Sequence, residues 1–133
     1  MRIKKPDHKN ALSLILQSER EMKFTLTLNV NENSSSTIVR NIYECFRMIG
    51  DAILISQGLE ITNHINSINA LLKIKVNTDR PLIVIETLRR LRHNINYYGY
   101  HPTLAETNDA ISIAKSCYRP ILGYIKTHII KSN

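Results

Sequence analysis

Hydrophobic residues recur at the three- and four-residue steps of an α-helix in five segments of the chain. The clearest segment follows an Asn- and Ser-rich stretch at residues 29–36. Its apolar positions follow steps of four, three, four and three: Ile38, Ile42, Cys45, Ile49 and Ala52. The serines before it favour a helix N-cap, and Gly58 after it favours the left-handed conformation that closes a helix. The pattern predicts a helix with one face in the core.

The first hydrophobic segment begins near Pro6 and Asp7 and has an ambiguous end. Its apolar residues lie mostly at helical spacing: Leu12, Ile15, Leu16, Met22 and Leu26. Residues 23–30, however, alternate apolar and polar side chains as a strand does. We favour a long first helix, because a single strand would find no partner elsewhere in the chain.

Two further helices are predicted in the middle of the chain. The first is short, covers residues 63–74 and places four apolar residues on one side: Ile65, Ile68, Leu71 and Leu72. The second begins near Asp79 and Pro81 and ends at Gly99 and Pro102. Its predicted core stripe again follows helical steps: Val84, Leu88, Leu91, Ile95 and Tyr98. We expect Tyr98 to be buried with the rest of this stripe.

The last segment opens with Thr103 and Glu106 at the spacing of a capping box. Its inward positions are predicted to be Ile111, Ala114, Tyr118, Ile121 and Ile125. Pro120 lacks a backbone N–H and is expected to kink this helix or loosen its hydrogen bonds.

Four long helices and one short helix, joined by short connections, predict the fold class. Glycine is scarce and no Asn-Gly or Asp-Gly turn occurs, which argues against an all-β fold. We predict an all-α protein with an antiparallel up-and-down four-helix bundle and one additional short helix. Residues 1–133 are expected to form a single domain.

The composition adds limits on the class of protein. The two cysteines, Cys45 and Cys117, are far apart and fit helical patterns, so we expect buried free thiols in a reducing cytosol. No apolar run approaches the roughly 20 residues that span a bilayer. A soluble, cytoplasmic protein without membrane contact is predicted. No motif for zinc, Mg²⁺, a phosphate loop or a serine triad occurs, so no metal or cofactor is expected.

The formal charge of +7 is concentrated in the C-terminal half of the chain. Residues 73–133 carry ten Lys and Arg against four Asp and Glu, whereas residues 1–72 carry eight against seven. A positive surface attracts phosphates, so this bias is typical of a polyanionic partner. It also suits a protein that uses charge only for solubility, and the charge alone leaves both interpretations open.

A cluster of polar residues in the stretch RRLRHNINYYGYHPT, residues 89–103, is the main candidate for function. Four of its side chains share one helical face away from the core stripe: Arg89, Arg92, His93 and Asn96. Arginine binds phosphate, asparagine can hydrogen-bond a base or ribose, and histidine can transfer protons near neutral pH. The alternative is a solvated helix end whose positive charges complement the helix dipole.

Tyrosines and a second histidine extend the candidate site. Tyr97 and Tyr100 can stack on bases, although packing beneath the connection to the last helix is the simpler interpretation. His101 lies in the turn, outside the helical face. The other histidines are isolated in the sequence and are predicted to have surface or helix-end roles: His8, His64 and His128.

Two parts of the chain resemble the HEPN domains, small helical bundles that act with nucleic acids and nucleotides. They are NIYECFRMIGDAILISQGLEITNHINSINALL, residues 41–72, and LRRLRHNINYYGYHPTLAETNDAISIAKSC, residues 88–117. The likeness is to the prokaryotic type that is often associated with a minimal nucleotidyltransferase. Active members of the family are metal-independent ribonucleases with an R-x(4–6)-H motif, paired across a homodimer.

The resemblance places the family motif on the fourth predicted helix. Arg92 takes the arginine position and His93 the polar position after it, whereas the histidine position falls on Tyr97, Tyr98 or Gly99. Tyrosine titrates near pH ~10 and is a poor substitute for imidazole in proton transfer. The resemblance therefore implies a non-catalytic homodimer that binds RNA or a nucleotide phosphate. The implied binding residues are Arg89, Arg92, His93, Asn96 and Tyr97.

Alternatives to this prediction remain open. A toxin-like ribonuclease would use Arg92 with a displaced histidine, either His93 or His101. The family's nucleotidyltransferase partner, as found in toxin–antitoxin pairs, would modify Tyr97 or Tyr100. A third alternative is a protein-interaction module that binds no nucleic acid.

Overall fold

The chain forms five α-helices in a computed structural model that describes residues 4–130. No β-strand occurs within this range, so the all-α prediction is confirmed. The helices are α1 (His8–Thr25), α2 (Ser35–Ser56), α3 (His64–Leu72), α4 (Ile85–Tyr98) and α5 (Leu104–Ile125). A 3₁₀ turn, η1 (Leu82–Val84), precedes α4, and a π-helical turn, η2 (Lys126–Ile130), follows α5.

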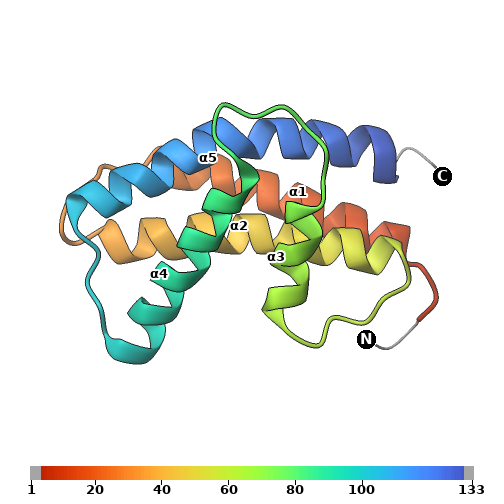
Figure 1. Cartoon of the computed structure of the whole chain (residues 1–133), viewed down its shortest axis with the longest axis horizontal. Helices are drawn as coiled ribbons and strands as arrows, with labels where there is room; N and C mark the ends of the chain where they lie inside the picture. Colours follow the sequence, from red (N-terminus) through yellow and green to blue (C-terminus); the bar gives the residue numbers. More distant parts are fainter. Residues whose placement is uncertain (1–3, 131–133) are drawn as a thin grey trace.

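The three longest helices, α1, α2 and α5, lie along the long axis of the molecule (Figure 1). The chain runs in opposite directions in α1 and α2, and α5 runs in the same direction as α2 (Figure 1). Both α3 and α4 lie obliquely across α2. Since α2 contacts α1, α3, α4 and α5, it is the central element of the core.

The helix α2 owes its central place to apolar residues on more than one side. All five residues of its predicted stripe are fully buried, and Tyr43 and Phe46 are buried beside them. Ser34 occupies the N-cap position, and Gly58 follows the helix with a positive φ of 75°. The predicted stripe and both predicted ends of this helix are confirmed.

A close approach between α2 and α3 occurs at Gly50. A Cβ atom at this position would lie 2.1 Å from the backbone carbonyl oxygen of Ser67 in α3. Only glycine lets the α3 backbone approach this closely, because any side chain would overlap with it. Gly50 therefore fixes the place where α3 crosses α2.

The helix α1 differs from the sequence prediction in its end and in its buried face. It ends at Thr25, and Leu26 caps it through a bond from its N–H to the Met22 carbonyl. Residues 23–25 belong to the helix, as favoured, whereas residues 26–30 are neither helix nor strand. Leu12 and Leu16, which belong to the apolar pattern of this segment, are 39% and 47% exposed.

The buried face of α1 includes small residues and does not include the leucines at positions 12 and 16. Its buried positions are Ala11, Ile15, Ser18, Met22 and Thr25. This face contacts α2, which leaves the neighbouring leucines, including Leu26, on the surface. The hydrophobic spacing was correct for a helix, but the stripe was broader than the surface that α2 covers.

Three predictions for α3 and α4 also need correction. Ile65, expected on the inner side of α3, is exposed, whereas Ile68 and Leu71 are buried as predicted. The fourth helix begins at Ile85 after the turn η1, so Asp79 does not cap it, and Val84 is only half-buried. Near its start α4 uses Ile85 as the core position instead.

The start of α5 confirms the predicted capping box. The Thr103 side chain accepts a bond of 3.0 Å from the Glu106 N–H, and the Glu106 carboxylate accepts one of 2.9 Å from the Thr103 N–H. Ile111 is half-buried. The other predicted inward positions are buried: Ala114, Tyr118, Ile121 and Ile125. Pro120 lies inside α5, which continues to Ile125.

A buried hydroxyl joins three helices at the centre of the core. Ser18 of α1 donates a hydrogen bond of 2.6 Å to the Cys45 carbonyl of α2. The Ser18 oxygen also lies 2.6 Å from the hydroxyl of Tyr118 in α5. Since the single proton of Ser18 goes to a carbonyl, the Tyr118 hydroxyl must be the donor in this second bond.

Both cysteines are buried free thiols, as predicted. Burial raises the pKa of Cys45 to about 12. The thiol is therefore protonated and unreactive at neutral pH. None of the helices between residues 4 and 130 has the length and apolar character required to cross a membrane.

Candidate nucleic-acid interface

The four polar residues predicted to share a face of α4 differ in their exposure to solvent. Arg89 and Arg92 are half-buried, whereas His93 and Asn96 are exposed. The arginines face the side of α4 that crosses α2, and the other two side chains lie toward solvent. The predicted surface therefore consists of two half-buried arginines and, next to them, two exposed polar side chains toward the end of α4.

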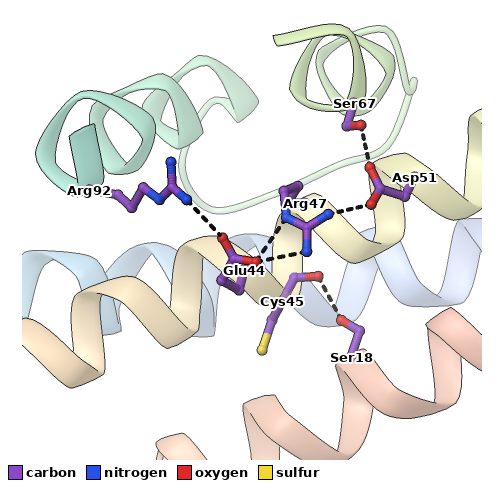
Figure 2. Close-up of polar contacts among 7 residues, drawn as sticks. All are labelled: Ser18, Glu44, Cys45, Arg47, Asp51, Ser67 and Arg92. Carbon is purple, nitrogen blue, oxygen red and sulfur yellow. Dashed lines mark hydrogen bonds and ion pairs between the residues drawn. The ribbon is translucent and has the colours of Figure 1, made fainter. Parts of the chain in front are cut away.

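Arg92 lies against α2, where it contacts an aromatic ring and a carboxylate. Its guanidinium carbon is 5.4 Å from the centre of the Tyr43 ring. Its Nη2 atom is 3.8 Å from Oε1 of Glu44 (Figure 2). A cation–π contact orients the guanidinium, and an ion pair this long and partly exposed contributes little. Arg92 is thus positioned but only loosely paired.

Arg89 has a stronger partner within its own helix. Its Nη2 lies 2.8 Å from the carboxylate of Glu86, three residues earlier, and its Nε also donates to that carboxylate. The hydrogen bond from Arg89 to Glu86 raises the pKa of Arg89. The positive charge of Arg89 is therefore partly neutralised, and Arg92 is the more available of the two arginines.

A chain of polar contacts extends from Arg92 across α2 to α3 (Figure 2). Glu44 accepts bonds of 2.7 and 2.9 Å from Arg47. Arg47 also pairs with the buried carboxylate of Asp51, which accepts a further bond from Ser67. Burial raises the pKa of Asp51, although the bond from Ser67 and the charge of Arg47 act in the opposite direction.

This network was not predicted from the sequence. Its signal was the spacing of Glu44, Arg47 and Asp51, which are three and four residues apart on the helix that carries the clearest core stripe. Their link to Arg92 depends on the crossing of two helices. Only the part within α2 could have been recognised from spacing.

The end of α4 carries a cluster of exposed rings. The His93 ring centre lies 4.6 Å from that of Tyr97 and 5.8 Å from that of Tyr98. Tyr97 is 68% exposed and Tyr98 is 75% exposed. These three side chains, which we call the α4 ring cluster, present flat surfaces to solvent next to the arginines.

The position of Tyr98 contradicts the prediction that it belongs to the core. Its spacing from Ile95 and Leu91 is correct for the buried stripe, and both of those residues are buried. However, α4 runs obliquely across α2, and its last turn extends past the helices that cover its earlier turns (Figure 1). Tyr98 therefore has no neighbouring helix to pack against.

Tyr100 and His101 lie in the turn after α4 and are not part of the α4 ring cluster. The Tyr100 hydroxyl donates a bond of 2.6 Å to the carboxylate of Glu106, and this bond raises the pKa of Tyr100. His101 is exposed. Within residues 4–130, no hydrogen bond or ion pair joins Arg92 to His93 or His101.

The remaining histidines lie elsewhere on the molecule. His8 and His64 begin α1 and α3, as expected for helix ends. His128 is exposed in the turn η2 after α5, as predicted, and its ring stacks on Tyr124 with the centres 4.1 Å apart. In the part of the chain that the structure describes, no three His, Cys, Asp or Glu residues are grouped to hold a metal ion.

Comparisons with protein-family models, with curated proteins and with solved structures find no match to this chain. Inferences about its function therefore rest on the residues and their geometry.

Proposed function

We propose that the protein is a HEPN-like module that binds single-stranded RNA or a nucleotide at the end of α4 without cleaving it. The observation that supports this proposal best is the exposed ring cluster of His93, Tyr97 and Tyr98 beside Arg92. Exposed aromatic rings offer flat surfaces on which the bases of a single strand can stack.

In the proposed complex, Arg92 would bind phosphate and the rings of the α4 ring cluster would bind bases. Bases stack on flat aromatic surfaces with little sequence preference, and the planar guanidinium binds phosphate through two donors. The long ion pair between Arg92 and Glu44 leaves this guanidinium able to turn toward a ligand. Asn96, one turn beyond Arg92 and exposed, would offer hydrogen bonds to a base or ribose.

The proposal includes a more detailed description of the fold. We assign α1, α2, α4 and α5 to an antiparallel up-and-down four-helix bundle, with α3 as the additional short helix. The reversal of chain direction from α1 to α2, with α5 alongside them, supports the assignment, while α4 crosses α2 obliquely (Figure 1). In the proposed homodimer, two α4 surfaces would face one ligand.

A non-catalytic role agrees with the chemistry of the α4 end. The position of the family histidine is occupied by Tyr97, Tyr98 or Gly99, and these residues do not exchange protons readily near neutral pH. The ribonuclease alternative needs His93 or His101 near a phosphate held by Arg92. In this chain the ring of His93 packs on the tyrosines instead.

Binding is tested by fluorescence anisotropy with a labelled single-stranded RNA of about 12 nucleotides, a length that one small domain can cover. Replacing both Tyr97 and Tyr98 with Ala should weaken binding about tenfold or more, and Arg92→Ala should also reduce the salt dependence of the affinity. Arg90→Ala is the matched control, because Arg90 lies on the same helix but lines the groove between α4 and α5. Undetectable binding by the wild-type protein at low salt would reject the proposal and favour a protein-interaction module.

Catalysis is tested separately by incubating the protein with the same RNA in EDTA. The proposal predicts intact RNA after hours at neutral pH. Cleavage that disappears in both Arg92→Ala and His93→Ala would establish the ribonuclease alternative instead. His101→Ala then distinguishes which of the two histidines acts.

The proposed nucleotidyltransferase partner would modify Tyr97 in preference to Tyr100. The hydroxyl of Tyr100 is engaged by Glu106, whereas the Tyr97 ring is largely exposed. Mass spectrometry after incubation with such an enzyme and ATP should therefore place the added nucleotide on Tyr97. Modification that persists in Tyr97→Phe and disappears in Tyr100→Phe would reverse this assignment.

A further inference from the structure

A second surface with binding character lies between α1 and α5, away from the α4 ring cluster. A groove of about 310 Å³ separates the C-terminal half of α1 from the middle of α5. Its floor is apolar and consists of Met22, Tyr118 and Leu122, all of them buried. Since this floor already belongs to the core, the groove is a permanent feature of the surface.

The apolar surface continues along α1 beyond the groove. Leu12, Leu16 and Leu26 are exposed and lie on the same side of the helix. At a rise of 1.5 Å per residue, the first and last of them are about 21 Å apart. These leucines belong to the apolar pattern of the first segment, yet the fold leaves them exposed. An exposed stripe of this length is typical of a contact surface.

The rim of the groove is positively charged. Lys23 of α1 and Lys115 and Arg119 of α5 line it. None of these three cations has an ion-pair partner among residues 4–130. The acidic side chain on the rim, Glu19, is paired with Lys126 at 3.1 Å. The surface therefore combines a long apolar stripe with unpaired positive charges beside it.

We propose that the α1–α5 groove binds an acidic amphipathic helix of a partner protein. Such a helix would place its apolar face on Leu12, Leu16 and the groove floor, and its carboxylates against Lys115 and Arg119. Charge complementarity of this kind guides association and selects the partner.

Other classes of partner fit this surface less well. A nucleic acid would use the cations but would leave the apolar stripe exposed to water. A membrane surface contacts protruding apolar side chains, whereas the floor here lies in a concave groove between two helices. A helix of about 14 residues matches both the length of the stripe and the concave shape.

The test is a selection from a displayed library of amphipathic helices about 20 residues long, with apolar residues fixed on one face and random polar residues on the other. We expect selected helices to be enriched in Asp and Glu. Their affinity should fall at least about tenfold for the variant Lys115→Glu/Arg119→Glu. The control variant Lys73→Glu/Lys75→Glu changes the net charge equally at exposed positions outside the groove and should bind within about twofold of wild type.

Three outcomes would overturn the proposal. Selected helices without acidic enrichment, or with equal affinity for Lys115→Glu/Arg119→Glu, would show that this groove does not select by charge. Loss of binding to single-stranded RNA, or to phosphatidylglycerol vesicles, in this variant without any helix binding would assign the groove to those partners. A Leu16→Ser variant should weaken helix binding and leave RNA binding at α4 unchanged, so this proposal and the proposed function are tested independently.

Discussion

Tyr43 in the centre of α2 and Tyr98 at the end of α4 have opposite environments. Tyr43 is 1% exposed and lies beneath the guanidinium of Arg92, whereas Tyr98 is 75% exposed. The difference comes from the neighbours of each helix, since α2 is contacted by four helices and α4 extends past its neighbours in its last turn. The same residue type thus stabilises the fold in one region and remains available to a ligand in the other.

The arginines of the two regions differ in the same way. Arg47 of α2 binds two carboxylates, those of Glu44 and Asp51, whereas Arg92 of α4 has one long ion pair. In the centre of the molecule, charge is used to satisfy buried groups. At the edge, charge is left partly unpaired, as a binding surface requires.

Removing the two tyrosine rings should give the largest contrast. Tyr43→Ala is expected to lower the free energy of unfolding by about 4 kcal/mol, because a buried aromatic side chain leaves a cavity. Tyr98→Ala should change it by less than about 0.5 kcal/mol, since its ring is exposed. Urea unfolding followed by circular dichroism measures both. A loss for Tyr98→Ala close to that for Tyr43→Ala would mean that the Tyr98 ring is buried in solution.

The second effect concerns Arg47. Arg47→Ala should cost about 3 kcal/mol, because it leaves the buried carboxylate of Asp51 without its cation. The double variant Arg47→Ala/Asp51→Asn should recover part of this loss in the same unfolding experiment. Arg92→Ala removes an arginine with a weaker ion pair and should cost less than about 1 kcal/mol. Equal losses for Arg47→Ala and Arg92→Ala would remove the distinction between the two regions.

Glycine substitutions give a smaller effect. Gly50→Ala should destabilise the fold by about 2 kcal/mol, because its Cβ would overlap with the Ser67 carbonyl and push α3 away. Gly123→Ala is the control within α5, where a Cβ meets no atom within 4 Å, and should raise stability by about 0.5 kcal/mol. Thermal unfolding of both variants tests this. An unchanged melting temperature for Gly50→Ala would show that α3 does not cross α2 at this point.

The smallest expected effect is a pH dependence at the start of α5. Partial burial acts to raise the pKa of Glu106, but bonds from Tyr100 and Thr103 outweigh it and hold the pKa below its usual value. Its contribution to stability is therefore present above about pH 4.3 and is lost as the pH falls through the lowered pKa. Solvent screening keeps it below about 1 kcal/mol. Unfolding from about pH 7 to pH 3 should show a steeper loss for wild type than for Glu106→Gln, and parallel curves would contradict this.

Helical spacing predicted α2 almost completely because every side of its apolar stripe is covered. The same reasoning was wrong for Tyr98, although its spacing was correct, and it gave no indication that Leu12 and Leu16 are exposed. Spacing states which residues share a face, whereas the crossing of neighbouring helices decides how much of that face is covered. The exposure of Leu12 and Leu16 in α1, and of Tyr98 at the end of α4, is therefore a tertiary property.

The candidate site was predictable to a similar extent. Local spacing grouped Arg89, Arg92, His93 and Asn96 on α4. The ion pair of Arg89 with Glu86, three residues earlier, could also be derived from spacing. The pairing of Arg92 with Glu44 joins residues far apart in the sequence and could not be derived from spacing. Which arginine is available to a ligand depends on these partners.

The buried hydroxyl of Ser18 sets an order of events during synthesis of the chain. Its partner Tyr118 is 100 residues later, and the buried Tyr118 hydroxyl is hydrogen-bonded through Ser18. While the ribosome is still making α5, α1 and α2 can pair, but the oxygen of Ser18 has no donor from α5. The completed core must therefore form late, after almost all of these residues have emerged from the ribosome.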